Sequence, residues 1–357
     1  MRASPLWSGE RFQNVHPVLP GLRDPAVPMP SMKDFMCAGQ RRVPRAALPS
    51  MDPLDAWRRK SDSGLRVTWL GHSTVLIEIG GLRILTDPVW GPRASPSTLV
   101  GPKRFQPVPV ALHDMPPVDV VLVSHDHYDH LDYPTIRALA RTRIPFVTSL
   151  GVGAHLEYWG VQPGRITELD WWESHRVPDS HVVLTAAPSQ HFSGRGLKDR
   201  NATLWSSFAI RSPDHAVFFS GDTGLTTEYH SIRQRLGPFS MVMLEIGGYY
   251  PAWGDIHLGP DNALKAHAML GGAFMPIHWG TFALAMHAWD QPAERLLELA
   301  LMSDTYLLMP QLGQAVEPAH REAVAPWWRD VDARGRWPAD TTEDEVTLSP
   351  SAPWPLD

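Results

Sequence analysis

The feature that most constrains this chain is a run of seven residues, 124–130, that reads Ser-His-Asp-His-Tyr-Asp-His. It directly follows an apolar run at residues 118–123, which predicts a central strand buried on both faces. Five imidazole and carboxylate groups therefore leave the end of one buried strand together. Imidazole nitrogen and carboxylate oxygen are the ligands that zinc prefers where thiolate is absent, so the run predicts a metal site.

The spacing inside this motif predicts two groups of ligands. His125 and His127 are two residues apart, so their side chains can point to the same side. Asp129 and His130 lie further along the loop, where they can serve a second ion. The alternative is a polar loop that contains histidines by chance. Three histidines and two aspartates within six positions favour metal binding over that alternative.

Three further residues complete a predicted pair of sites, and each follows a predicted strand, at residues 181–187, 216–220 or 273–277. They are His191, Asp222 and His278. Alone, each is a weak signal, because a single histidine at a strand end is more often a structural or surface residue. Together with the motif, they reach the number of ligands that two ions need.

The remaining pattern alternates strands with helices, which is typical of a mixed α/β layered domain. Further strands are predicted at residues 66–70, 74–79, 82–86, 145–148, 204–211 and 241–246, and the core is predicted to end at residues 306–309. Helices are predicted at residues 133–143, 153–160, 226–236, 261–270 and 292–303.

We divide the chain into three parts. Residues 1–60 form an irregular arm with one short helix near residues 52–60, and residues 61–316 form the main domain. Residues 317–357 form a tail rich in Pro, Trp and acidic residues, either draped over the core or partly disordered.

Composition excludes several classes of protein. The single cysteine, Cys37, allows neither an intramolecular disulfide nor a thiolate metal site. The net charge is −6 and there is no Lys/Arg block, so we expect no nucleic-acid partner. We find neither a signal peptide nor an apolar run of about 18 residues. We therefore expect a cytoplasmic protein, with peripheral attachment to a membrane left open.

At this point the sequence resembles the metallo-β-lactamase superfamily, whose signature is His-x-His-x-Asp-His followed by a later His, Asp and His. It is more specifically similar to the N-acyl-phosphatidylethanolamine-hydrolysing phospholipase D family. Three stretches carry this resemblance: Gly-Pro-Lys-Arg-Phe at 101–105, Leu-Asp-Trp-Trp-Glu at 169–173 and His-Trp-Gly-Thr-Phe-Ala-Leu at 278–284. The resemblance covers residues 66–313; the arm matches only in fragments such as residues 9–14, and the tail has no counterpart.

The resemblance implies the fold, the metals and the distribution of ligands. The implied fold is the metallo-β-lactamase αββα sandwich, an α/β fold with a dinuclear site at one edge. His125, His127 and His191 would hold one ion, Asp129, His130 and His278 the other, and Asp222 would bridge the pair. Two zinc ions are implied, with Mn²⁺ or Fe²⁺ left open; His127 favours zinc, because iron-binding relatives have Glu at this position.

The implied mechanism uses a hydroxide that bridges the two ions and attacks the substrate. We expect Asp129 to orient this hydroxide as well as to bind metal. His257 aligns with a histidine that the family places beside the metals, so substrate positioning or leaving-group protonation is one interpretation and an ordinary loop histidine the other. His72 and Asp87 are predicted to orient metal-binding imidazoles, and Tyr128 to line the pocket. The alternatives are a strand-end turn at Asp87 and a packing role for Tyr128.

The first functional hypothesis is a phosphodiesterase of the phospholipase D type. It would release N-acylethanolamine and phosphatidic acid from N-acyl-phosphatidylethanolamine or a related phospholipid. The second is a metal-dependent lactonase, similar to the sugar-phosphate lactonases, or a phosphodiesterase for small molecules. The net charge of −6 argues against a nuclease of the same superfamily. A non-enzymatic role would require that some of the seven ligands were missing, and all seven are present.

The resemblance also suggests a homodimer and contact with membrane lipid through apolar surface near the arm. Five apolar residues of the arm could form a lip at the membrane or pack on the core instead. They are Met29, Met32, Phe35, Met36 and Trp57.

Overall fold

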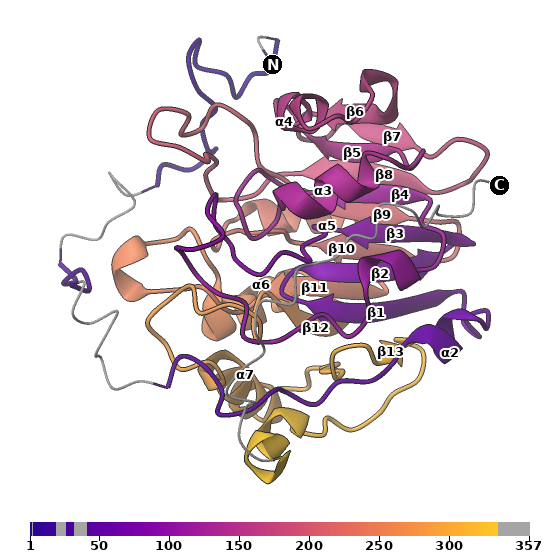
Figure 1. Cartoon of the computed structure of the whole chain (residues 1–357), viewed down its shortest axis with the longest axis vertical. Helices are drawn as coiled ribbons and strands as arrows, with labels where there is room; N and C mark the ends of the chain where they lie inside the picture. The colour runs from indigo at the N-terminus through magenta and orange to yellow at the C-terminus, as the bar shows by residue number, and fades with distance from the viewer. Residues whose placement is uncertain (2, 19–25, 32–40, 335–357) are drawn as a thin grey trace.

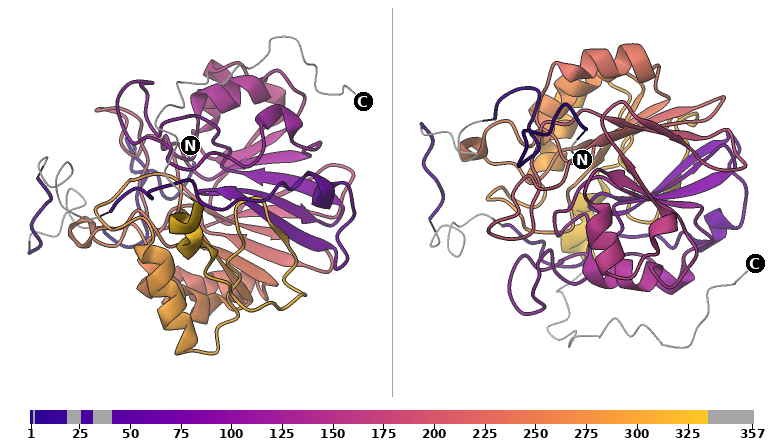
Figure 2. Two further views of the ribbon diagram at one scale, coloured as in Figure 1. Left: turned by 60° about the horizontal axis from the view of Figure 1, so that its bottom comes forward. Right: turned by 90° about the horizontal axis from the view of Figure 1, so that it is seen from above.

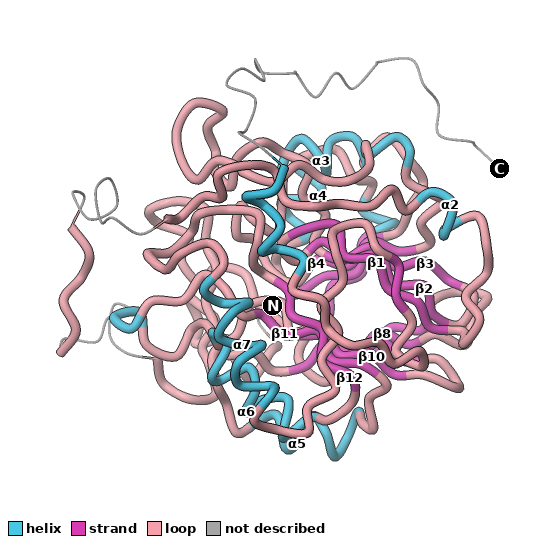
Figure 3. The backbone as a smooth tube through the Cα atoms, turned by 90° about the horizontal axis from the view of Figure 1, so that it is seen from below, coloured by secondary structure: helices cyan, strands magenta, loops and turns pink. Residues whose placement is uncertain are grey.

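The computed structural model describes residues 1, 3–18, 26–31 and 41–334 of the chain. In this described part, two β-sheets face each other and helices cover their outer faces (Figures 1 and 2). Seen from below, the layers follow the order helix, sheet, sheet, helix, with α2 to α4 on one side and α5 to α7 on the other (Figure 3). The αββα layering expected from the sequence is therefore confirmed.

The first sheet has seven strands in the order β13-β1-β2-β3-β4-β5-β6 within the described chain. Strands β1 to β3 pair antiparallel and β3 to β6 run parallel. The bounds are β1 (Leu65–Gly71), β2 (Thr74–Ile79), β3 (Leu82–Thr86), β4 (Val120–Val123), β5 (Phe146–Ser149), β6 (Ile166–Leu169) and β13 (Ala315–Val316). The helices that pack on its outer face are α3 (Tyr133–Leu139) and α4 (Gly153–Tyr158), through Ile136 and Leu156.

The second sheet has the order β12-β11-β10-β9-β8-β7 over the same residues. Its strands are β7 (Ser174–Arg176), β8 (Val183–Ala187), β9 (Ser207–Arg211), β10 (Ala216–Phe219), β11 (Met241–Glu245) and β12 (Ala273–Ile277). Strands β10 to β12 run parallel, and β7 to β10 pair antiparallel. The helices on its outer face are α5 (Glu228–Leu236), α6 (Gly259–Leu270) and α7 (Gln291–Leu301), which contribute Tyr229, Ala266 and Leu296 to the core.

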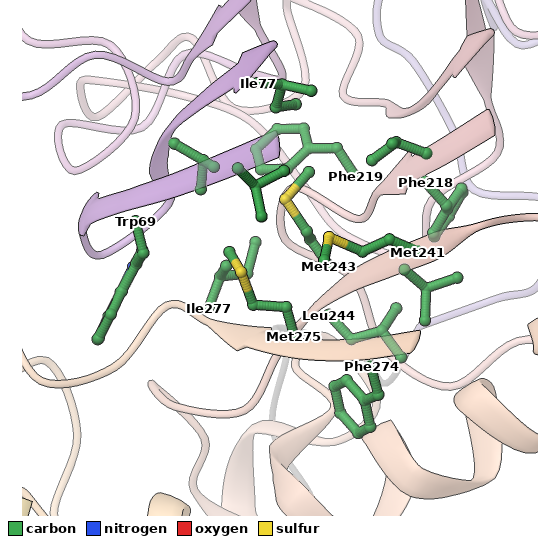
Figure 4. Packing of buried hydrophobic residues seen from close by; sticks show 14 of the residues in the cluster. Trp69, Ile77, Phe218, Phe219, Met241, Met243, Leu244, Phe274, Met275 and Ile277 are labelled. Atoms are coloured by element: carbon green, nitrogen blue, oxygen red, sulfur yellow. The ribbon is translucent and has the colours of Figure 1, made fainter. Parts of the chain in front are cut away.

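The main core lies between the sheets because side chains alternate along each strand. On β2, Val75 and Ile77 belong to this core, whereas Leu76 between them faces the outer helices. Figure 4 shows Ile77 opposite Phe219 and Met243 of the second sheet. Burial of this apolar surface is the main interaction that holds the two sheets together.

Several predicted elements are shorter in the structure than in the sequence-based prediction. The helix predicted at 133–143 ends at Leu139, and its first turn is capped by Asp132, whose carboxylate accepts from the backbone N–H of Thr135. The strand predicted at 204–211 begins only at Ser207, because Leu204 and Trp205 turn away to form a separate apolar cluster. Residues 306–309 make a single bridge, between Leu307 and Phe274, and are not a full strand.

Among residues 41–334, three strands and four short helices were not predicted from the sequence. Strands β6, β7 and β13 have at most four residues each and mostly half-buried or exposed side chains, so they lack a clear period. The 3₁₀ helices are η2 (Leu112–Asp114), η3 (Pro163–Arg165), η4 (Pro251–Trp253) and η5 (Trp327–Arg334).

The first part of the predicted tail packs against the core. Trp327 and Trp328 of η5 are buried and contact Trp279, and Trp327 also contacts Trp69. Their indole N–H groups donate to the carbonyl of Met309 and to the carboxylate of Glu294, respectively. This segment is therefore draped over the domain, whereas residues 335–357 lie outside the described residues.

The described part of the arm also lies on the domain. Its predicted helix is α2 (Leu54–Trp57), and Trp57 is buried in the core under α3 and α4, which removes it from any apolar lip. Met29 is 43% exposed, and Met32, Phe35 and Met36 lie outside the described residues. No helix among the residues that the structure describes is long and apolar enough to cross a membrane.

The packing of Trp328 gives a prediction about stability. Replacement of this buried side chain by alanine (Trp328→Ala) removes its aromatic contacts and its hydrogen bond to Glu294. We expect the free energy of unfolding, measured by guanidinium titration, to fall by about 3–5 kcal/mol. Tyr158→Ala is the control, because Tyr158 is 88% exposed and its loss should cost less than about 0.5 kcal/mol. Equal values for the two variants would contradict the assigned packing.

Candidate metal centre

All seven predicted ligands lie at one edge of the sandwich, where strands from both sheets end. His125, His127, Asp129 and His130 follow β4 of the first sheet. The other three ligands follow β8, β10 and β12 of the second sheet; they are His191, Asp222 and His278. Each strand ends at this edge and passes into a loop, so residues that are far apart in sequence converge there.

The first group of ligand atoms contains three imidazoles and one carboxylate oxygen. Nδ1 of His127 lies 2.9 Å from Nε2 of His125 and 3.2 Å from Nε2 of His191. Oδ2 of Asp222 completes the group, 3.9 Å from Nε2 of His125 and 3.7 Å from that of His191. The four atoms lie within 4.8 Å of one another, as ligands of one ion must.

The second group lies on the other side of Asp222. Oδ1 of Asp222 is 3.1 Å from Nε2 of His130 and 3.2 Å from Nε2 of His278. Oδ2 of Asp129 is 3.4 Å and 3.3 Å from the same two nitrogens. The two oxygens of Asp222 thus face different groups, which is the arrangement expected of a bridging carboxylate.

Glycine at position 221 permits this approach of Asp222. Gly221 has a φ of +53°, and a Cβ atom there would lie 2.8 Å from Cβ of Ser124 and 3.1 Å from the carbonyl oxygen of Ser206. Any larger residue would push the loop after β10 away from the start of the motif after β4.

The donor set fits a pair of cations. Nε2 of His130 and Oδ1 of Asp222 face each other without hydrogen-bond geometry, so both are buried polar atoms that lack a hydrogen-bond partner in the described structure. Buried polar groups left in this way are costly unless a cation or water satisfies them. An ion between them would satisfy both atoms, which supports the predicted metal site.

The protonation states also suit metal binding. Burial lowers the pKa of His125 and His191 well below the usual value, so both imidazoles are neutral and offer a lone pair. Burial raises the pKa of Asp222, but His130 and His278 oppose it and hold the pKa well below its usual range. Burial lowers the pKa of His278, yet Asp222 and Asp129 raise it to about 10. The same carboxylates that attract a proton to this ring would attract a metal cation.

Asp87 lies behind the second group. Its Oδ2 accepts from Nδ1 of His130 at 2.6 Å, and its two oxygens accept from the N–H and hydroxyl groups of Ser124. The bond to Nδ1 leaves Nε2 of His130 pointing toward Asp222. The structure therefore places Asp87 where the sequence analysis expects an orienting residue, in contact with one predicted ligand.

His72 contacts the second group from the β1–β2 turn. Its Nε2 lies 2.8 Å from Oδ2 of Asp129, and its ring lies 4.0 Å from that of His278. Burial and the nearby His278 lower the pKa of His72 to about 3, so the ring is neutral and donates to Asp129. It can therefore orient Asp129, and not an imidazole as predicted from the sequence.

His257 also lies beside the ligands, together with a carboxylate that the sequence analysis missed. Its Nδ1 donates to Oε2 of Glu245 at 2.7 Å, and its ring is 5.0 Å from that of His191. Glu245 is completely buried, and its Oε1 accepts from the N–H of Thr223. Its only sequence signal is an acidic residue at the end of the apolar strand β11.

Tyr128 lines a pocket next to the motif. The pocket has a volume of about 290 Å³ and also includes Arg93, Trp159 and Arg195 in its lining. The hydroxyl group of Tyr128 donates to the carbonyl of Arg195 at 2.6 Å, and the Arg195 guanidinium lies 3.9 Å from the Tyr128 ring centroid. Tyr128 therefore both lines the pocket and packs against Arg195.

The shared carboxylate gives a prediction about metal content. Asp222→Asn keeps the shape of the side chain but removes the charge that faces both groups. We expect the wild-type protein to hold about two ions per chain. The variant should retain fewer than half of them after dialysis, measured by plasma mass spectrometry. Asp214→Asn, on the exposed turn between β9 and β10, is the matched control and should retain both. An Asp222 variant with undiminished metal would contradict the bridging position.

Comparisons with known proteins agree with this geometry. Residues 82–279 match the family model described as a beta-lactamase superfamily domain. An uncharacterised protein of Mycobacterium tuberculosis is 48% identical over 291 residues, which cover 80% of this chain and 77% of that protein. The N-acyl-phosphatidylethanolamine-hydrolyzing phospholipase D 1 of Caenorhabditis elegans is 36% identical over 277 residues, covering 73% of this chain and 78% of that enzyme.

Solved structures share the fold at lower identity. An isothiocyanate hydrolase from Delia radicum gut bacteria has a TM-score of 0.57 at 20% identity, over 71% of this chain and 98% of that one. Igni18, a metallo hydrolase from Ignicoccus hospitalis, has a TM-score of 0.53 at 22% identity, over 71% and 97%. The chain belongs to the metallo-β-lactamase superfamily of metal-dependent hydrolases and lies near its N-acyl-phosphatidylethanolamine-hydrolysing phospholipase D family.

Proposed function

We propose that this protein is a zinc-dependent phosphodiesterase of the phospholipase D type. It would release N-acylethanolamine and phosphatidic acid from N-acyl-phosphatidylethanolamine or a related phospholipid. The observation that carries the proposal is the position of Asp222, whose Oδ2 faces His125 and His191 and whose Oδ1 faces His130 and His278, because two adjacent ions suit the displacement of an oxygen at phosphorus. The relative from Caenorhabditis elegans supports the choice of substrate.

The seven predicted ligands would be divided between two ions. His125, His127 and His191 would hold one zinc ion, and Asp129, His130 and His278 the other, with Asp222 between them. When bound, such ions lower the pKa of water and neutralise negative charge on the phosphoryl oxygens. Asp129 lies at the outer side of the second group, where its carboxylate can orient the attacking water.

His257 is the proposed proton donor for the leaving group. Its Nδ1 is occupied by Glu245, so Nε2 is the nitrogen available to substrate. Burial lowers the pKa of His257, but Glu245 outweighs this and raises it above the usual value, which favours the protonated ring. A protonated imidazole beside the scissile bond can neutralise a departing alkoxide.

The rim of the pocket beside Tyr128 is the proposed point of contact with a membrane surface. Leu99 and Val100 are 76% and 71% exposed, and Leu197 extends fully into solvent. They stand on two loops that also supply pocket-lining residues, Ser97 and Arg195. Exposed apolar side chains at loop tips can insert into the boundary between headgroups and acyl chains, which would bring lipid to the site.

The substrate proposal is tested by assay of the metal-loaded protein on N-acyl-phosphatidylethanolamine in mixed micelles. We expect mass spectrometry to detect N-acylethanolamine and phosphatidic acid in equal amounts, because one bond is cleaved per turnover. Removal of metal by a chelator should abolish both products, and added zinc should restore them. Hydrolysis of lactones without cleavage of any phosphodiester would overturn the proposal and favour the lactonase alternative.

The role of His257 is tested separately from metal binding. In His257→Asn, the proton donor is lost while all seven predicted ligands remain. We expect kcat to fall by about 10²–10⁴-fold, because general acid catalysis typically contributes this much. Metal content should stay at the wild-type value. His230→Asn, on the exposed face of α5, is the control and should keep full activity. A normal kcat in the His257 variant would leave this residue without a catalytic role.

A further inference from the structure

The N-terminal arm reaches the metal centre through one side chain. The first residues of the arm fold back on themselves, with a bridge between Trp7 and Phe12. Phe12 is buried against Trp171, Leu204 and Trp205. Its backbone N–H also donates to the carbonyl of Asn201. These contacts fix the arm on the loops that follow β8, at the top of the molecule in Figure 1.

Two residues after Phe12, the amide of Asn14 binds the backbone of His191. Nδ2 of Asn14 donates to the carbonyl oxygen of His191 at 2.7 Å, and Oδ1 accepts from the N–H of His191 at 3.1 Å. Both backbone groups of a predicted ligand are thus held by one side chain that is 177 residues away in sequence. Oδ1 also accepts from the indole N–H of Trp205, which fixes the orientation of the amide.

The imidazole of His191 is held from the opposite side. Its Nδ1 donates to the carbonyl of Ile256 at 2.8 Å, so Nε2 points toward His127 and Asp222. Since the ring has few degrees of freedom left, the position of the backbone decides where Nε2 lies. Asn14 holds that position, because residue 191 lies outside any strand and its own N–H and carbonyl bind only Asn14 within the described structure. The preceding residue, Gln190, is held separately by Thr223 and Gly224.

We propose that Asn14 is a positioning residue for the first metal site, and that the arm is therefore part of this site. The inference rests on the proposed metal binding of His125, His127 and His191. Groups that orient a ligand without touching the ion typically change metal affinity by about 10–100-fold. Asn14 acts on one ligand of the first group and contacts none of the second group, so its effect is confined to one of the two ions.

The test measures zinc retained by the purified full-length chain against increasing chelator. For Asn14→Ala, we expect one zinc ion to be lost at a free zinc concentration at least about tenfold higher than in the wild type. The second ion should be retained as before. His191→Ala provides the reference for loss of the first ion. Gln13→Ala is the matched control, since Gln13 is the exposed neighbour and only its backbone is bound.

Asn14→Asp keeps the size of the side chain and the acceptor for His191 N–H but removes the donor to the carbonyl. This variant should weaken the binding of the same zinc ion. If circular dichroism shows that the alanine variant does not fold, Asn14→Asp tests the role of Asn14 in its place. Zinc retention equal to that of Gln13→Ala in both folded variants would overturn the role of Asn14. Absence of zinc from the wild-type protein would instead refute the metal site itself.

Discussion

The position of one carboxylate, that of Asp222, sets the geometry of the whole site. Its two oxygens face two groups of imidazoles, and each group combines histidines from the ends of both sheets. This position requires the loop after β10 to lie against the start of the motif after β4, and Gly221 allows that contact. The segments between the ligand loops, 131–190, 192–221 and 223–277, contain β5 to β12, which belong to the two sheets whose ends meet here.

The burial of charged groups explains why so many hydrogen bonds surround the predicted ligands. Asp87, Asp129 and Glu245 are buried carboxylates, and each accepts from a histidine or from a backbone N–H group. Asp222 makes no such hydrogen bond in the described structure, but Nε2 of His130 and of His278 lie 3.1 Å and 3.2 Å from its Oδ1. An isolated charge in such a place would be strongly unfavourable. Asp87 and Glu245 also bind Nδ1 of His130 and of His257, and this fixes which nitrogen of these two imidazoles faces the centre.

Much of this could be predicted from the sequence, because the ligands stand in local patterns at the ends of apolar strands. The motif at 124–130 and the residues His191, Asp222 and His278 are all brought together as expected. Glu245 could not be predicted, since it only ends an apolar run, and its contact with His257 depends on the fold. Asn14 lies in a segment without periodicity, and its bond to His191 spans 177 residues. Pairings of this kind exist only once both sheets are formed.

Because the predicted ligands come from both sheets, bound metal would affect how long the folded molecule persists. The motif belongs to the seven-stranded sheet, whereas His191, Asp222 and His278 belong to the six-stranded sheet. A pair of bound ions would act as a non-covalent cross-link between the two halves of the sandwich, beside the apolar core. The halves could then separate only if the ions left, because ligands that bind only the native state stabilise it by mass action. Resistance to thermal inactivation and to proteolysis would therefore rise with the supply of metal in the surroundings, independently of catalysis.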